Sequence, residues 1–251
     1  DHHYPLGSFV INGFAALKQL EEFKICIQCR PIGSSWIFKG ILQLPSLKKF
    51  SLRVPFIRNE EWILLEQFLK KQNNLESLRI WVTRGPSTQA RYQQQNEHLE
   101  KIIRCLEDKK SWKSLDLRSP YWSLEALSKG LGGLSMVNQV QRLRLQGSDD
   151  TVLSKAKPWK RVEGLCKFIK NQKESLKVLD FCLPLVLENS IVVHIAEAIS
   201  QLGQLRELCL WFNASFDGHF TNQFDKLVEY FQDTLQNDIP EGSRNKLKRS
   251  T

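Results

Sequence analysis

The residues of this sequence that could do chemistry are its cysteines and histidines, and they form no established catalytic or metal-binding pattern. Cys26 and Cys29 make a single CxxC with no second pair to complete a zinc site. The five histidines have no cysteine or carboxylate partner at ligand spacing, and no phosphate-binding, zinc-protease, hydrolase or kinase motif occurs. The sequence therefore predicts no enzyme activity, no cofactor and no metal.

The composition indicates a folded protein. Apolar residues make up 41% of the 251 residues, which argues against disorder, and no apolar run approaches the ~18–20 residues that span a bilayer. Six cysteines do not make a disulfide framework, so we expect reduced thiols and an intracellular, cytoplasmic protein. The net charge is +9, with 30 basic and 18 acidic side chains in residues 1–180 and 2 against 8 in residues 181–240. A basic body of this kind favours acidic partners.

A repeated segment sets the expected architecture. Seven segments share the pattern apolar-x-x-apolar-x-apolar, and four of the six intervals between their first positions are 27–29 residues. The alternating apolar positions that end each segment predict a short strand. The segments begin at Leu20, Leu47, Leu75, Trp112, Val140, Leu176 and Leu205.

Between these segments the apolar residues recur at helical spacing. Asn59 is the expected N-cap of one helix, and Ser123 is the expected N-cap of another that stops at Gly132 and Gly133. One strand and one helix cannot bury both of their apolar faces alone, whereas stacked units share a continuous core. We therefore predict an α/β solenoid of about seven units, with a curved parallel β-sheet on the concave face and helices on the convex face.

The stretch Ala198–Leu210 ends a helix and continues through a short turn into Leu205, Leu208 and Leu210. It resembles the leucine-rich repeat family, in particular the 28–29-residue intracellular, ribonuclease-inhibitor-like kind, and the resemblance covers about residues 14–235. The family places Asn or Cys three positions after the last strand leucine, and here only Asn213 matches, so its asparagine ladder is largely absent. We expect a repeat domain at 1–235, closed by a helix at 220–235, and a basic, disordered tail at 236–251.

In the geometry that this resemblance implies, the variable strand positions point into the concave side. Arginine and tryptophan dominate interface energetics because they bury much area, and arginine also pairs with carboxylates. A solvated sheet face is the alternative interpretation. The predicted partner-binding residues are Lys49, Arg53, Arg79, Trp81, Arg118, Arg142, Arg144 and Trp211.

These features together predict a non-catalytic protein–protein interaction scaffold or recognition module, as part of a larger chain or assembly. Its basic concave surface would bind an acidic protein segment. Two alternatives stay open: a substrate-receptor or sensor module of a multidomain signalling or ubiquitin-ligase protein, and an RNA-contacting subunit that uses a lysine cluster between Lys155 and Lys177.

Overall fold

The computed structural model describes residues 12–28, 35–84, 89–107, 109, 111–134, 137–148, 157–184 and 189–213. Strands and helices alternate along this part of the chain, as the sequence pattern predicts. The expected helix at 220–235 and the tail at 236–251 lie outside the described residues. The elements are β1 (Glu22–Cys26), α2 (Ser35–Ile41), β2 (Lys49–Val54), α3 (Asn59–Lys71), β3 (Ser77–Val82), α4 (Gln89–Arg104), β4 (Ser114–Ser123), α5 (Leu124–Gly132), β5 (Arg142–Ser148), the 3-10 helix η1 (Pro158–Arg161), α6 (Glu163–Lys170), β6 (Val178–Pro184), α7 (Asn189–Ser200) and β7 (Glu207–Asn213).

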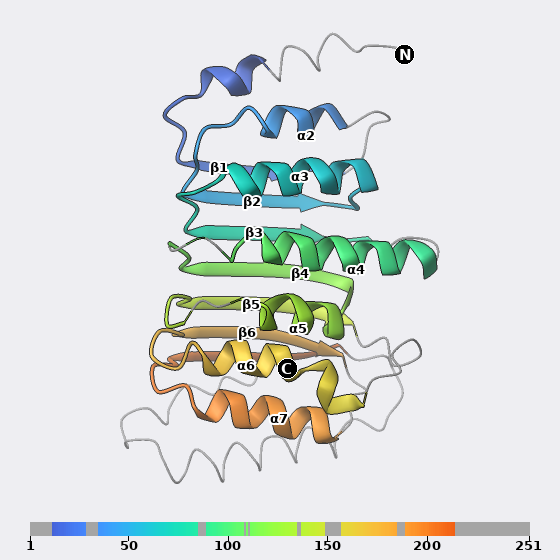
Figure 1. The fold of residues 1–251 in the computed structure, drawn as a ribbon, viewed down its shortest axis with the longest axis vertical. Coiled ribbons are helices and arrows are strands. Elements are labelled where there is room, and N and C mark those ends of the chain that lie inside the picture. Colours follow the sequence, from blue (N-terminus) through green and yellow to red (C-terminus); the bar gives the residue numbers. More distant parts are fainter. Residues whose placement is uncertain are drawn as a thin grey trace.

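The seven strands form one sheet in the order β1-β2-β3-β4-β5-β6-β7, and every neighbouring pair is parallel. Equivalent positions of the seven sequence segments pair with one another. The register that runs from Glu22 through Lys49 and Ser77 continues to Glu207 on β7. The helices lie on one face of the sheet, and in the described part of the chain β1 and β7 are its two edges (Figure 1). The predicted α/β class with a parallel sheet is confirmed.

The core fills the space between the sheet and the helices. Alternate strand residues such as Phe50, Leu52, Leu78 and Ile80 are buried, and the residues between them are more exposed. This alternation follows from the two-residue period of a strand. It leaves one side of each strand available for polar and aromatic side chains, and these make the surface described below.

Two helix starts were predicted, and the structure confirms one of them. The Ser123 hydroxyl accepts a hydrogen bond from the Ala126 N–H at 3.0 Å and caps α5. The prediction for α3 was wrong, because Arg58 is the N-cap and the Glu61 carboxylate accepts its N–H at 2.8 Å. The Asn59 side chain instead bonds His98 on α4.

Helices α5 and α6 approach each other closely through glycine. A Cβ atom built on Gly164 would lie 2.2 Å from the Ser128 carbonyl oxygen, and one on Gly132 would lie 2.5 Å from the Gly164 Cα. The Ser128 hydroxyl accepts a hydrogen bond from the Leu165 N–H at 3.0 Å. Adjacent units are therefore joined by backbone contact as well as by apolar side chains.

Candidate functional site

The exposed face of the sheet, on the side away from the helices, collects all eight predicted binding residues. Arg53 on β2 pairs in register with Trp81 on β3, which in turn pairs with Arg118 on β4. Arg142 and Arg144 follow on β5. The structure thus brings seven of the residues together on four adjacent strands, and it places Trp211 two strands further along on β7.

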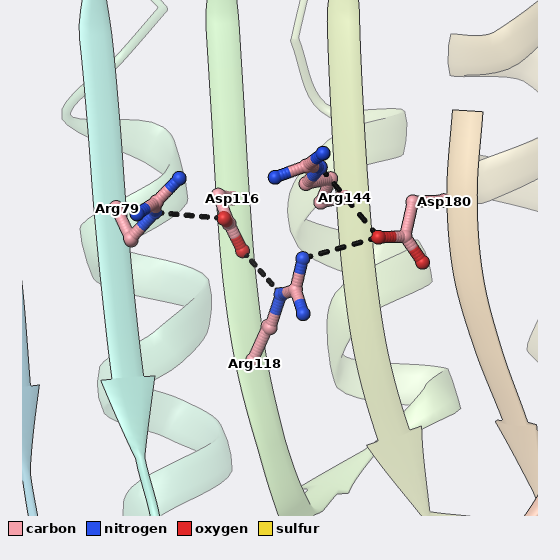
Figure 2. A network of polar contacts seen from close by, with 5 residues as sticks. All are labelled: Arg79, Asp116, Arg118, Arg144 and Asp180. Atoms are coloured by element: carbon pink, nitrogen blue, oxygen red, sulfur yellow. Dashed lines mark hydrogen bonds and ion pairs between the residues drawn. The ribbon is translucent and has the colours of Figure 1, made fainter. Parts of the chain in front are cut away.

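A ladder of arginine and aspartate side chains crosses the centre of this face (Figure 2). Arg79 Nε lies 2.9 Å from Asp116 Oδ2, and Arg118 Nε lies 2.7 Å from Asp116 Oδ1. The second aspartate, Asp180 on β6, has its Oδ2 atom 3.1 Å from Arg118 Nη2 and 3.5 Å from Arg144 Nε. We call these five residues the charge ladder.

The charge ladder corrects the expected character of the surface. A basic surface was expected from the sequence, but two carboxylates neutralise much of the charge on three of the arginines. The Asp116 side chain is only 5% exposed and that of Asp180 15%, so the ion pairs of both carboxylates are partly shielded from water. Asp116, Arg144 and Asp180 lie in one row of the sheet, as the repeat of the sequence segments predicts, because Arg144 pairs in register with both aspartates.

Two further cations of the set are held near the first edge of the sheet. The Arg53 guanidinium carbon lies 3.8 Å from the centre of the Trp81 ring, a cation–π contact. Lys49 Nζ lies 3.6 Å from Glu22 Oε2, and Lys24 Nζ lies 2.6 Å from Glu22 Oε1. The interactions with Lys24 and Lys49 hold the pKa of the Glu22 carboxyl below its usual range.

Arg142 and Trp211 are exposed on the same face. Arg142 is exposed and makes no ion pair within the described part of the chain. Trp211 is 48% exposed, and Cys182 pairs with it in register on β6. Burial raises the pKa of the Cys182 and Cys209 thiols, which therefore stay neutral near pH 7. The end of the face near β7 is thus less charged than its centre.

Among the residues that the structure describes, the histidines and cysteines are not gathered into a centre. Within the described ranges, no group of three or more His, Cys, Asp or Glu side chains is placed to hold a metal ion. His194 bonds the Ser190 carbonyl through Nδ1 at 2.6 Å, and His98 stacks on Trp62. Cys26 is exposed, and Cys29 lies outside the described residues. None of the helices in the described part of the chain has the length and apolar character that a membrane crossing requires.

Three comparisons with known proteins bear on the family. No protein-family model matches the chain, and a search of curated proteins found no match. Among solved structures, a sugar phosphate isomerase/epimerase from Parabacteroides distasonis is similar, with 11% sequence identity, a TM-score of 0.25 and coverage of 92% of this chain and 88% of that one.

The comparisons correct two predictions. The identification as a leucine-rich repeat protein was wrong: no family model matches the chain, and the solved structure that matches is named a sugar phosphate isomerase/epimerase. The non-catalytic scaffold rested on that identification and was wrong with it. A likeness at this identity and TM-score carries no argument for a barrel or for isomerase activity, and we assign neither. The statement that stands is an α/β protein with a seven-stranded parallel sheet.

Proposed function

We propose that this protein binds a partner polypeptide on the exposed face of its sheet, through the eight residues from Lys49 to Trp211. The proposal also treats the chain as a curved, open stack of strand–helix units. The register supports this arrangement, since equivalent positions of each unit fall in the same row from β1 to β7.

The observation that carries the proposal is the surplus of positive charge on a face that also holds the half-buried Trp81 and the exposed Trp211. The charge ladder has three guanidinium groups for two carboxylates. Arg53 and Arg142 add two cations without an ion pair in the described residues. Arginine and tryptophan are among the residue types that contribute most to binding energy at protein interfaces. The planar guanidinium group of arginine donates two hydrogen bonds to one carboxylate.

The positions of the two unpaired arginines constrain the partner. Arg53 and Arg142 are three strands apart, about 14 Å, and four residues apart along the strand direction, about 13 Å. The diagonal between them is therefore about 20 Å, the length of roughly six extended residues. We expect a partner segment with acidic side chains at about this separation and an apolar side chain that packs on Trp211.

The charge ladder has a positioning role in this proposal. Hydrogen bonds from Asp116 and Asp180 hold the guanidinium groups of Arg79 and Arg118 in fixed orientations, which lowers the entropy cost of binding, and Asp180 also forms a longer ion pair with Arg144. Since these arginines are already paired, they contribute specificity through geometry more than through net charge. Reversing the unpaired arginines is therefore the sharper test.

The experiment selects twelve-residue peptides from a displayed random library on the wild-type protein and measures the Kd of the best binders by fluorescence anisotropy. We expect peptides rich in Asp or Glu, at least tenfold weaker affinity for the Arg53→Glu/Arg142→Glu double variant, and steep weakening with salt. A matched control, Lys39→Glu/Lys167→Glu, makes the same charge change on exposed residues of helices α2 and α6. Equal loss in both variants, or none in the first, would reject the exposed face as the binding surface.

A further inference from the structure

A hollow lies on the helical side of the molecule, where the C-terminal ends of α3 and α4 meet. Helices α3 and α4 are neighbours on that side of the sheet (Figure 1). The cavity has a volume of about 590 Å³, within the range of small-molecule sites. It is lined by Glu66, Lys70, Asn73, Lys101, Arg104, Cys105 and Lys109.

The lining is strongly cationic. Four of its seven side chains are lysine or arginine, and the one carboxylate is Glu66. Burial raises the pKa of the Cys105 thiol to about 11, so this group stays neutral and adds no negative charge at physiological pH. Cys105 donates its S–H to the Lys101 carbonyl at 3.1 Å. The hollow therefore has three more positive than negative groups.

Internal pairing leaves much of this charge available. Lys70 Nζ lies 2.7 Å from Glu66 Oε1, which uses the only carboxylate of the lining. Arg104 has only a long contact, 4.0 Å, with Glu100. Lys101 makes no ion pair within the described residues. Lys109 is 94% buried, whereas Lys101 and Arg104 are exposed, so these two are the cations that a ligand can reach most easily.

We infer that this hollow binds a small organic ligand that carries two or more phosphate groups. Lysine and arginine donate charge-assisted hydrogen bonds to phosphate oxygens, and several phosphates are needed to engage cations on two helices at once. The Asn73 amide, which also lines the hollow, can add a neutral donor. The site is on the opposite side of the sheet from the proposed partner surface and does not depend on it.

A structural role for the same cations makes different predictions. Lysine and arginine in the last turn of a helix stabilise the exposed carbonyl groups there. That role predicts that removing Lys101 and Arg104 lowers the thermal midpoint without any dependence on phosphate. A purely structural role also gives no reason for Glu66→Gln to change the affinity for an added anion.

The test titrates inorganic tripolyphosphate into the full chain by calorimetry at 50 mM NaCl. We expect binding to wild type, at least tenfold weaker binding to Lys101→Gln/Arg104→Gln, and several-fold tighter binding to Glu66→Gln, which removes the one negative charge of the lining. The control Lys129→Gln neutralises a lysine of α5 that pairs with Glu125 outside the hollow, and it should bind as wild type does. No binding to wild type, or a Glu66→Gln affinity equal to or weaker than that of wild type, would overturn the inference.

Discussion

Replacing Asp116 with Asn tests whether the charge ladder stabilises the sheet as well as orienting its arginines. The side chain of Asp116 is 5% exposed, and each of its oxygens accepts a hydrogen bond from a different arginine. An Asn amide keeps one acceptor and turns a donor toward the second guanidinium. The substitution thus removes the negative charge and places the amide N–H of Asn against a guanidinium N–H, while the shape of the side chain stays the same.

The expected cost follows from the two contacts. A hydrogen bond to a charged group contributes ~1.5–3 kcal/mol, and the Arg118 contact at 2.7 Å, with this arginine 27% exposed, belongs in that range. Arg79 is 46% exposed, so solvent screening reduces its contribution to below ~1 kcal/mol. We expect the free energy of unfolding to fall by about 2–3 kcal/mol, which lowers the thermal midpoint by roughly 4–12 °C in a protein of this size.

The assay is thermal and urea unfolding monitored by tryptophan fluorescence, since Trp62 and Trp122 are buried in the core. The matched control is Glu21→Gln, which removes a carboxylate from an exposed pair with Lys48 and should leave the midpoint unchanged. A double-mutant cycle with Arg118→Gln should show coupling between the two sites. If Asp116→Asn unfolds at the wild-type midpoint, the ladder does not stabilise the sheet and our assignment of its role is refuted.

Two more predictions concern the helices. Gly164→Ala places a Cβ against the Ser128 carbonyl, which is backbone and cannot move aside, so we expect urea unfolding to show about 1–3 kcal/mol of destabilisation. The control Gly203→Ala, with open space around the added Cβ, should be neutral or slightly stabilising. Equal effects of the two variants would argue against the close packing of α5 and α6. Burial lowers the pKa of His98, so the unfolded chain binds more protons as pH falls below about 6.5 and stability decreases there. The thermal midpoint of wild type should therefore drop more between pH 7.5 and pH 5.5 than that of His98→Gln, and parallel profiles would contradict this.

The sequence predicted the alternation of strands and helices because the period of the apolar residues changes between the two. The strand segments that begin near Leu47 and Leu75 have buried alternating positions, and such positions can be recognised without a structure. The same register predicted which side chains share the exposed face. Pairing between side chains was harder to predict, because it depends on which carboxylate comes within reach of which arginine.

Several features had no local signal. Gln72 and Gln172 are buried, and their side-chain oxygens accept backbone N–H bonds from Leu47 and from Val140, residues that are 25 and 32 positions away in sequence. Asn59 is of a residue type that commonly caps helices, yet its side chain forms a hydrogen bond with His98 on the next helix. The basic hollow between α3 and α4 combines Lys70 with Lys101 and Arg104, and only the packing of the two helices brings these residues together.

The most direct test of the central claim places a photo-crosslinking amino acid at Ser51 or Ser77, both on the exposed face, and at Lys129 on α5 as a control. Each variant is illuminated with a peptide obtained by the library selection. We predict adducts from Ser51 and Ser77, none from Lys129, and loss of the adducts when Arg53→Glu and Arg142→Glu are added. Equal or stronger crosslinking from Lys129, or adducts at the sheet that persist after charge reversal, would contradict the assignment of the exposed face as the binding surface.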